Sequence, residues 1–536
     1  MSPPPAGSPP PRSTGRSAVL VAIGIFCSRI TGLIRQRVFA HYFGLGLEAD
    51  AFYAAAKIPN FLQNLFGEGA LSASFIPVYA GLLARGERKA ADRVAGAIVS
   101  LLALVVSVLV LAGILATPLF IDVIAPGFHG DKRTLTIDIV RVLFPGTGLL
   151  VLSAWCLGVL NSHHRFLLSY ASGVMWNVAM IATLLIFGGH ASLSMLAVYL
   201  GWGSVAGSAL QFGVQVPFVL RLAPDLRLAL DTASTHVHTI VRNFMPAFVS
   251  RGVVQLSNYI DTLLATWLPN GAVAALSNAT TLTLLPVSLF GMAVSAAELP
   301  AMSGVASADA DGVDVVRRRL DTGLRRIAFF VVPSAMAFLA LGDVVAGALL
   351  QTGRFSRADS QYVWAILAGS AVGLLAQTLG RLYSSTYYAL RDTRTPLRYA
   401  LVRVTLTTVL GYLFAFPLPG LIGIAPRWGA AGLTASAGMA GWVEMLLLRR
   451  SLNARIGRTG LPFDYTAKLW ASAAAGAAAA WAIKLSIPTL HPVVTAVLVL
   501  GPYGLAFFAA TWLFRLPEAS IAIRSLRWFR SGRLQK

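Results

Sequence analysis

Long apolar segments separated by short polar connections make up most of the chain. Because an apolar helix of about 20 residues spans the hydrocarbon core of a bilayer, the pattern predicts about fourteen membrane-spanning helices. The connections are short, so we expect an all-α integral membrane protein without an extramembrane catalytic domain. The expected spans are 18–43, 50–83, 95–118, 135–160, 168–188, 193–220, 240–266, 272–300, 322–349, 361–388, 397–416, 428–448, 468–487 and 492–514.

Composition supports this interpretation and excludes an ordinary soluble protein. Of 536 residues, 56% are hydrophobic and 12% are charged, and the mean hydropathy is +0.70. The two cysteines, Cys27 and Cys156, lie in separate apolar segments, so neither a disulfide framework nor a redox pair is expected. No metalloprotease, nucleotide-binding or serine-hydrolase motif occurs in a suitable context. We therefore expect neither an enzyme nor a bound metal or organic cofactor.

The net charge of +21 has a membrane explanation rather than a nucleic-acid one. Lys and Arg residues concentrate in alternate connections, as they do in cytoplasmic loops. This asymmetry predicts that both termini are cytoplasmic. The opposite set of connections holds few basic residues, namely Lys132, Arg133, Arg354, Arg357, Arg427 and Lys484.

An internal repeat divides the predicted spans. Three short matches share nearly the same offset: Ser28-Arg29 with Ser250-Arg251, Phe66-Gly67 with Phe290-Gly291, and Pro77 with Pro300. Transporters are commonly built from two related halves, so we expect two pseudo-symmetric six-helix lobes followed by two further helices. The predicted divisions are a disordered cytoplasmic tail 1–16, lobes 17–221 and 222–450, helices thirteen and fourteen in 451–514, and a basic cytoplasmic tail 515–536.

Charged side chains inside the spans are the candidate site. Each costs about 2.5–3.5 kcal/mol at mid-bilayer, so it normally faces a cavity or a partner. Arg29, Arg35 and Lys57 lie in the first two spans and predict a cationic cavity for an anionic substrate, because guanidinium groups bind phosphate oxygens in pairs. The alternative for Arg29 is a structural ion pair with Glu68 or Asp50.

Other charges in the spans have structural and functional interpretations. Asp261 and Glu298 are candidate ion-coupling acids for a proton or Na⁺, or partners of Arg251. Asp138 and Arg141 are three residues apart on one helical face, so we expect a mutual ion pair.

Some polar residues are expected to serve no site. We expect Arg381 and Arg403, near cytoplasmic span ends, to extend toward the interface, and His163 and His164 to be solvated loop residues.

The first two spans contain a characteristic set of residues: Ser28-Arg29, Gly32, Arg35, Phe43-Gly44, Asp50-Ala51-Phe52, Lys57, Pro59-Asn60, Phe66, Glu68-Gly69-Ala70, Ser72, Phe75 and Pro77. With these residues the chain resembles the MurJ (MviN) lipid II flippase family. That resemblance implies a fold of the multidrug/oligosaccharidyl-lipid/polysaccharide exporter kind, with two six-helix lobes around a cationic cavity and a lipid-tail groove at the last two helices. It also implies that Arg29, Asp50 and Glu68 match positions that matter in the family.

The chain departs from the family pattern at two places. Gln63 and Asn64 stand where the family often has a basic pair, and Thr280 and Thr281 stand where it often has an arginine. Both departures remove positive charge. We expect Arg251, the repeat equivalent of Arg29, to supply a second guanidinium.

The resemblance implies a flippase that moves lipid-linked peptidoglycan precursor (lipid II) from the inner to the outer leaflet of the bacterial cytoplasmic (inner) membrane by alternating access. Its implied roles are peptidoglycan biosynthesis, cell wall biogenesis and cell shape. The expected driving force is membrane potential or a coupling monovalent ion. Membrane lipids and cell-wall synthesis proteins are the candidate partners, and nucleic acid is not expected. The expected substrate-binding residues are Arg29, Arg251, Asp50, Glu68, Arg35 and Lys57.

Four other functions are alternatives to this one. A flippase for another polyprenyl-pyrophosphate-linked glycan would use the same fold and the same arginines. A cation-coupled drug exporter would favour an acidic, aromatic cavity. A polyprenyl-phosphate glycosyltransferase would need acidic metal ligands or a large outer loop, and a lipid-binding scaffold would lack transport.

Overall fold

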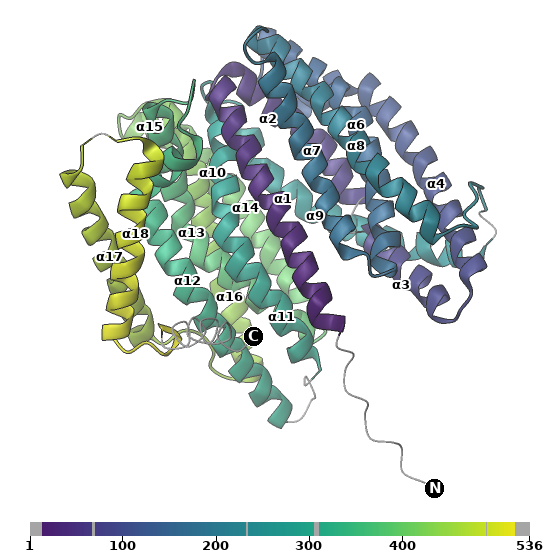
Figure 1. Ribbon diagram of the computed structural model, residues 1–536. Helices are drawn as coiled ribbons and strands as arrows, with labels where there is room; N and C mark the ends of the chain where they lie inside the picture. The colour runs from purple at the N-terminus through teal and green to yellow at the C-terminus, as the bar shows by residue number, and fades with distance from the viewer. Residues whose placement is uncertain (1–12, 67–69, 232–233, 305–309, 489, 520–536) are drawn as a thin grey trace, which may run out of the picture. The chain divides into compact units, whose positions relative to one another are not determined.

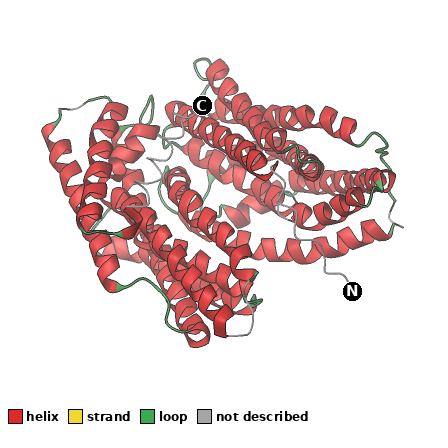
Figure 2. Ribbon diagram, turned by 60° about the horizontal axis from the view of Figure 1, so that its bottom comes forward, coloured by secondary structure: helices red, strands yellow, loops and turns green. Residues whose placement is uncertain are grey.

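The computed structural model describes residues 13–66, 70–231, 234–304, 310–488 and 490–519 (Figure 1). Every regular element in this part of the chain is helical (Figure 2), which confirms the predicted all-α class. The chain forms two compact units: unit 1 contains residues 1–43 and 47–259, and unit 2 contains residues 44–46 and 260–536. The division lies inside one long helix, whereas the sequence predicts a lobe boundary at 221/222.

Unit 1 contains eight complete helices and most of a ninth within the described residues. The helices are α1 (Ser13–Phe43), α2 (Leu47–Phe66), α3 (Ala70–Ala84), α4 (Arg88–Leu115), α5 (Thr117–Ile124), α6 (Gly130–Ser162), α7 (Phe166–Phe187), α8 (Leu193–Leu222) and the greater part of α9 (Thr235–Ala265). Because α1 begins at Ser13, the last four residues of the predicted disordered tail are helical, and residues 1–12 lie outside the described part.

Unit 2 continues from the end of α9. Its elements are α10 (Ala272–Pro286), the π-helical turn η1 (Val287–Met292), α11 (Ala293–Ser303), α12 (Ala310–Leu350), α13 (Arg357–Ala389), α14 (Arg394–Ala415), α15 (Pro417–Leu421), the 3₁₀ turn η2 (Pro426–Trp428), α16 (Gly429–Ile456), α17 (Phe463–Ser486) and α18 (Pro492–Leu513). Of the predicted basic tail 515–536, residues 520–536 lie outside the described part.

Ten helical segments of the described chain are long and apolar enough to cross a membrane. The expected spans that do not meet this measure correspond to α1, α7, α9 and α17; an apolar stretch of α7, Ala171–Phe187, is shorter than the others. α1 carries several basic side chains, and α9 and α17 each carry both basic and acidic ones. These charges lower the mean hydropathy of the three helices. The count of fourteen spans stays a prediction.

Helix α6 is the centre of unit 1. It packs against α2, α4 and α8, and α7 packs against both α1 and α8. A buried polar chain ties three of these helices together: Ser153 Oγ donates to Gln215 Oε1 at 2.9 Å, and Gln215 Nε2 donates to Ser172 Oγ at 2.6 Å. An unmade hydrogen bond in an apolar interior is costly, so this chain fixes the relative positions of α6, α8 and α7.

Helix α13 has the corresponding place in unit 2. It packs against α10, α12 and α16, and α14 packs against α16. α13 and α16 approach so closely at Gly373 and Gly438 that a Cβ on either glycine would collide with the backbone of the other helix. Two hydrogen bonds cross the same contact, from Thr434 Oγ1 to Ile366 O at 2.9 Å and from Trp442 Nε1 to Val372 O at 2.7 Å.

One member of the repeat found in the sequence lies in an irregular turn. Phe290 and Gly291 lie in the π-helical turn η1 between α10 and α11, whereas Gly67, which matches Gly291, lies outside the described residues. Gly291 faces Thr378 of α13, and the space there admits no side chain. π-Helical turns insert an extra residue into a helix and are often found at functional positions.

The last two helices pack against α12. Ala477, Ala480, Val499 and Tyr503 join Leu341 of α12 in a buried cluster. The resemblance implies a lipid-tail groove at the last two helices, but one half of the Ala-rich stretch 471–482 of α17 is buried against α12 and α18. The other half, including Ala471, Ala474, Ala475, Ala478 and Ala482, is exposed.

Candidate functional site

Asp50 forms a buried ion pair with Lys132. The Lys132 Nζ to Asp50 Oδ2 distance is 2.7 Å, and the side chains are 9% and 1% exposed, respectively. Lys132 also lies over the ring of Phe128 at 4.0 Å. Sequence reasoning assigned Lys132 to an exterior connection and offered Asp50 as a partner of Arg29; the structure instead joins the beginnings of α2 and α6 through Asp50 and Lys132.

Arg35 packs against α7. Its guanidinium lies 4.6 Å from the centre of the Trp176 ring, and Nη1 is 3.4 Å from Met180 Sδ. Gly32 and Thr31 on the same side of α1 lie against Asn177. The aromatic ring stabilises the cation without neutralising it. Arg35 therefore fixes α1 on α7 and adds positive charge to this part of unit 1.

Arg29 lies on α1 and is exposed. No ion pair of Arg29 is found within the part of the chain that the structure describes. Because Asp50 is bound to Lys132 and Glu68 lies outside the described residues, the alternative of an Arg29–Asp50 pair is wrong and that of an Arg29–Glu68 pair stays untested. An exposed guanidinium can bind two oxygens of a phosphate or pyrophosphate through two parallel hydrogen bonds.

Lys57 is next to α9. Its Nζ is 5.7 Å from the Tyr259 ring, and Tyr259 donates a hydrogen bond to Lys57 O at 2.8 Å. Phe61, one turn further along α2, packs edge-on against the same ring. α9 also contains Arg251, whose side chain lies outside the described residues. The structure thus brings the helices that carry Lys57 and Arg251 together.

The two candidate coupling acids have different surroundings. Glu298 of α11 is 12% exposed and lies 3.5 Å from Arg319 and 3.8 Å from Arg326, both on α12. Neither partner is the expected Arg251. Glu298 therefore links α11 to α12 through two guanidinium groups. Asp261 is half-buried near the end of α9.

Ion pairs predicted from local spacing differ from those in the structure. Asp138 and Arg141 are exposed, and neither belongs to an ion pair among the described residues. Arg403 of α14, expected to extend to the interface, binds Glu444 of α16 with an Nε–Oε2 distance of 3.1 Å.

His163 makes a contact with Tyr79 that the sequence did not predict. Its Nε2 lies 3.1 Å from the hydroxyl of buried Tyr79, so it is not a solvated loop residue, whereas the neighbouring His164 is exposed. Burial lowers the pKa of His163. Within the described residues, no group of three or more His, Cys, Asp or Glu side chains is arranged to hold a metal ion.

The fold and these charges define a class: a multi-span membrane transporter whose helical units repeat one packing pattern and whose first helix carries an exposed guanidinium. The family model described as "Lipid II flippase MurJ" matches residues 39–514. The chain belongs to the MurJ lipid II flippase family.

Curated relatives support the same assignment. The lipid II flippase MurJ of Burkholderia cenocepacia is 31% identical over 446 residues, which cover 82% of this chain and 84% of the relative. A probable lipid II flippase MurJ of Vibrio cholerae is 29% identical and covers 82% of each chain.

Solved structures show the same fold. A lipid II flippase MurJ in an inward closed conformation matches with a TM-score of 0.75 and 22% identity, covering 92% of this chain and 98% of that one. An inward-facing multidrug resistance transporter of the MATE family, from the MOP superfamily, matches with a TM-score of 0.63 and 16% identity, covering 82% and 98%.

Proposed function

We propose that this protein transports lipid II, a polyprenyl-pyrophosphate-linked muropeptide, from the inner to the outer leaflet. Family membership supports the substrate class. The structural observation that carries the proposal is Arg29, an exposed guanidinium on α1 with no ion-pair partner in the described chain. Its chemistry suits a pyrophosphate, because the planar donor pair matches two phosphate oxygens and desolvates more readily than an ammonium group.

The proposed binding group consists of Arg29 with Lys57 and Arg251 as further cations. Lys57 and Arg251 are on helices that touch each other within unit 1, where α1 also lies. Asp50 and Arg35 support this group indirectly, because Asp50 anchors α2 to α6 and Arg35 anchors α1 to α7. Glu68 keeps its proposed role on the basis of the resemblance alone.

The protein would work in the bacterial inner membrane with both termini in the cytoplasm. The concentration of Lys and Arg in alternate connections supports this orientation. With the cytoplasm negative, each negative charge that moves outward releases about 2.3 kcal/mol per 100 mV. Membrane potential would then drive alternating access of two lobes, and Asp261 and Glu298 are the candidates for coupling a monovalent ion.

The test is rescue of a bacterium depleted of its own lipid II flippase, with inner-leaflet lipid II measured at matched membrane expression. We expect the wild-type chain to rescue growth and to lower inner-leaflet lipid II, and Arg29→Ala and Arg251→Ala to fail. Arg133→Ala is the matched control, because Arg133 belongs to an exposed ion pair with Asp122 that contributes little.

The outcomes separate the parts of the proposal. Failure of the well-expressed wild-type chain to lower inner-leaflet lipid II would refute lipid II as substrate and favour another polyprenyl-linked glycan. Normal transport by Arg29→Ala would refute the role of the guanidinium. Loss in Arg29→Ala with normal transport by Arg251→Ala would refute only the second guanidinium.

A further inference from the structure

A kink in α12 creates a junction of three helices in unit 2. Leu341 has non-helical backbone angles, with φ −129° and ψ 17°, inside an otherwise continuous helix. Two indole groups bind carbonyl oxygens just before the kink: Trp364 Nε1 of α13 donates to Leu339 O at 3.0 Å, and Trp481 Nε1 of α17 donates to Ala340 O at 2.9 Å. The kink is thus held in place by side chains from two other helices.

A charged pair lies directly beyond the kink. Lys484 Nζ of α17 is 2.7 Å and 2.9 Å from the two carboxylate oxygens of Asp343 of α12, and both side chains are 19% exposed. The ammonium lies 4.6 Å from the Trp481 ring and 5.8 Å from the Trp364 ring. Asp343 neutralises the charge of Lys484, while the two rings hold its position.

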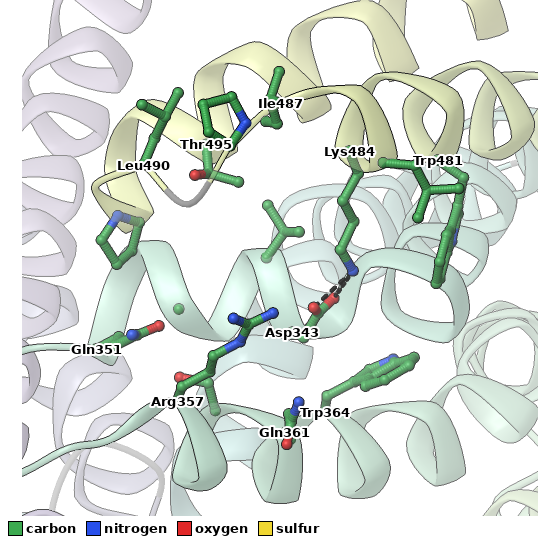
Figure 3. A pocket seen from close by; sticks show the side chains of 16 residues that line it. Asp343, Gln351, Arg357, Gln361, Trp364, Trp481, Lys484, Ile487, Leu490 and Thr495 are labelled. Atoms are coloured by element: carbon green, nitrogen blue, oxygen red, sulfur yellow. Dashed lines mark hydrogen bonds and ion pairs between the residues drawn. The ribbon is translucent and has the colours of Figure 1, made fainter.

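A cavity of about 480 Å³ opens beside this pair. Figure 3 shows Lys484 reaching across to Asp343 from one wall, while Arg357 and Gln361 rise from α13 on another. Arg357 is exposed and belongs to no ion pair within the described residues. The charged lining therefore consists of one neutralised pair and one further cation, which leaves one net positive charge in the cavity.

The other residues that line the cavity form a polar side and an apolar side. Gln351 and Gln361 offer amide donors and acceptors near Arg357, whereas Leu485, Ile487 and Leu490 form an apolar side. In membrane proteins, tryptophan is enriched at the level of the lipid headgroups, where hydrocarbon meets water. A molecule that fits would combine one negative charge, hydroxyl groups and an apolar part.

We propose that this cavity binds the phosphate-bearing headgroup of an anionic membrane lipid. The phosphate accepts hydrogen bonds from Arg357, and its headgroup hydroxyls contact the two glutamines. The start of its acyl chains lies along Leu485 and Ile487. The cavity contains the junction of α17 with α12 and α13, so a bound lipid stabilises the attachment of the last two helices. Placement in the outer leaflet rests on the proposed orientation of the chain, whereas headgroup binding itself does not.

The test measures binding of short-chain lipids to the full-length protein in neutral detergent. Dihexanoylphosphatidylglycerol is the anionic probe, dihexanoylphosphatidylcholine the zwitterionic probe, and glycerol 3-phosphate and inorganic phosphate are the free phosphate probes. Arg357→Gln removes the cation, and Gln361→Glu places a negative charge on the same wall. Arg354→Gln is the matched control, since Arg354 is exposed just before the start of α13 but does not line the cavity. Thermal unfolding without lipid verifies that each variant is folded.

We expect the anionic lipid to bind with an apparent Kd that rises about tenfold or more in Arg357→Gln and in Gln361→Glu, because each change removes or opposes a charge-assisted hydrogen bond. Arg354→Gln should bind within about twofold of wild type. Equal binding of both lipids, or an unchanged Kd in Arg357→Gln, would overturn the proposal. Equally tight binding of inorganic phosphate or glycerol 3-phosphate would overturn its lipid part. Lipid II transport is measured separately, so failure of either proposal is recognised independently.

Discussion

The buried pair of Asp50 and Lys132 permits a quantitative test of structural against substrate-binding roles. Asp50 is 1% exposed and Lys132 is 9% exposed, and they join α2 to α6. Removing one member leaves the other charged and buried, which costs about 3–5 kcal/mol. That corresponds to about two to four powers of ten in the ratio of folded to unfolded protein. Replacing both members by apolar residues of similar volume is often close to neutral.

We therefore expect Asp50→Leu and Lys132→Met each to lower the free energy of unfolding by about 3–5 kcal/mol, and the double variant to recover most of it. Equilibrium unfolding in mixed detergent micelles gives the coupling free energy, and flippase rescue at matched expression gives transport. A structural role predicts that the double variant transports lipid II. If the double variant is as stable as wild type but does not transport, Asp50 or Lys132 acts on the substrate and the structural reasoning is refuted.

Three further results are expected. Gly291→Ala should destabilise unit 2 by about 1–3 kcal/mol, because the added Cβ would collide with Thr378 Cγ2. Adding Thr378→Ser should restore stability. Unchanged thermal unfolding of Gly291→Ala would contradict this packing. Burial lowers the pKa of His163, so the folded state favours its neutral form. Stability should therefore decrease as pH falls below about 6.5, and it should decrease less in His163→Gln. Thermal unfolding measured against pH tests this. Hydrogen bonds from Thr395 and the ion pair with Arg455 lower the pKa of Asp392 to about 2. The contribution of Asp392 to stability should therefore be present above about pH 4 and disappear as pH falls toward 2. The same acid-induced loss of stability in Asp392→Asn would argue against this assignment.

The all-α class could be predicted from the sequence because it depends on long apolar segments. The match of Phe290-Gly291 with Phe66-Gly67 marked the position of η1, but nothing in it indicated a π-helical turn. Helices with several charges, such as α1 with Arg29 and Arg35, were located less securely by hydropathy than by their residue motif. Helical class is therefore largely a local property of the sequence, whereas the number of spans stays a prediction.

Partners of charged residues were predicted less well, because they depend on which helices are neighbours. Local spacing indicated a pair of Asp138 and Arg141, whereas the buried pair joins Asp50 to Lys132, far apart in the sequence. Nothing in the order of residues identifies α6 as the helix beside α2. A lysine close to the membrane boundary was the available signal, and its cost of burial could have suggested an acidic partner.

The close approach of α13 and α16 has a mechanical consequence. Their backbones meet at Gly373 and Gly438, and bonds from Thr434 and Trp442 cross the contact. At this contact no side chain lies between the two backbones, so α13 and α16 are held close together there. We expect the two helices to move together during transport. Bending inside unit 2 is then left to the irregular segments that pack against α13, namely the π-helical turn η1 and the kink at Leu341 of α12.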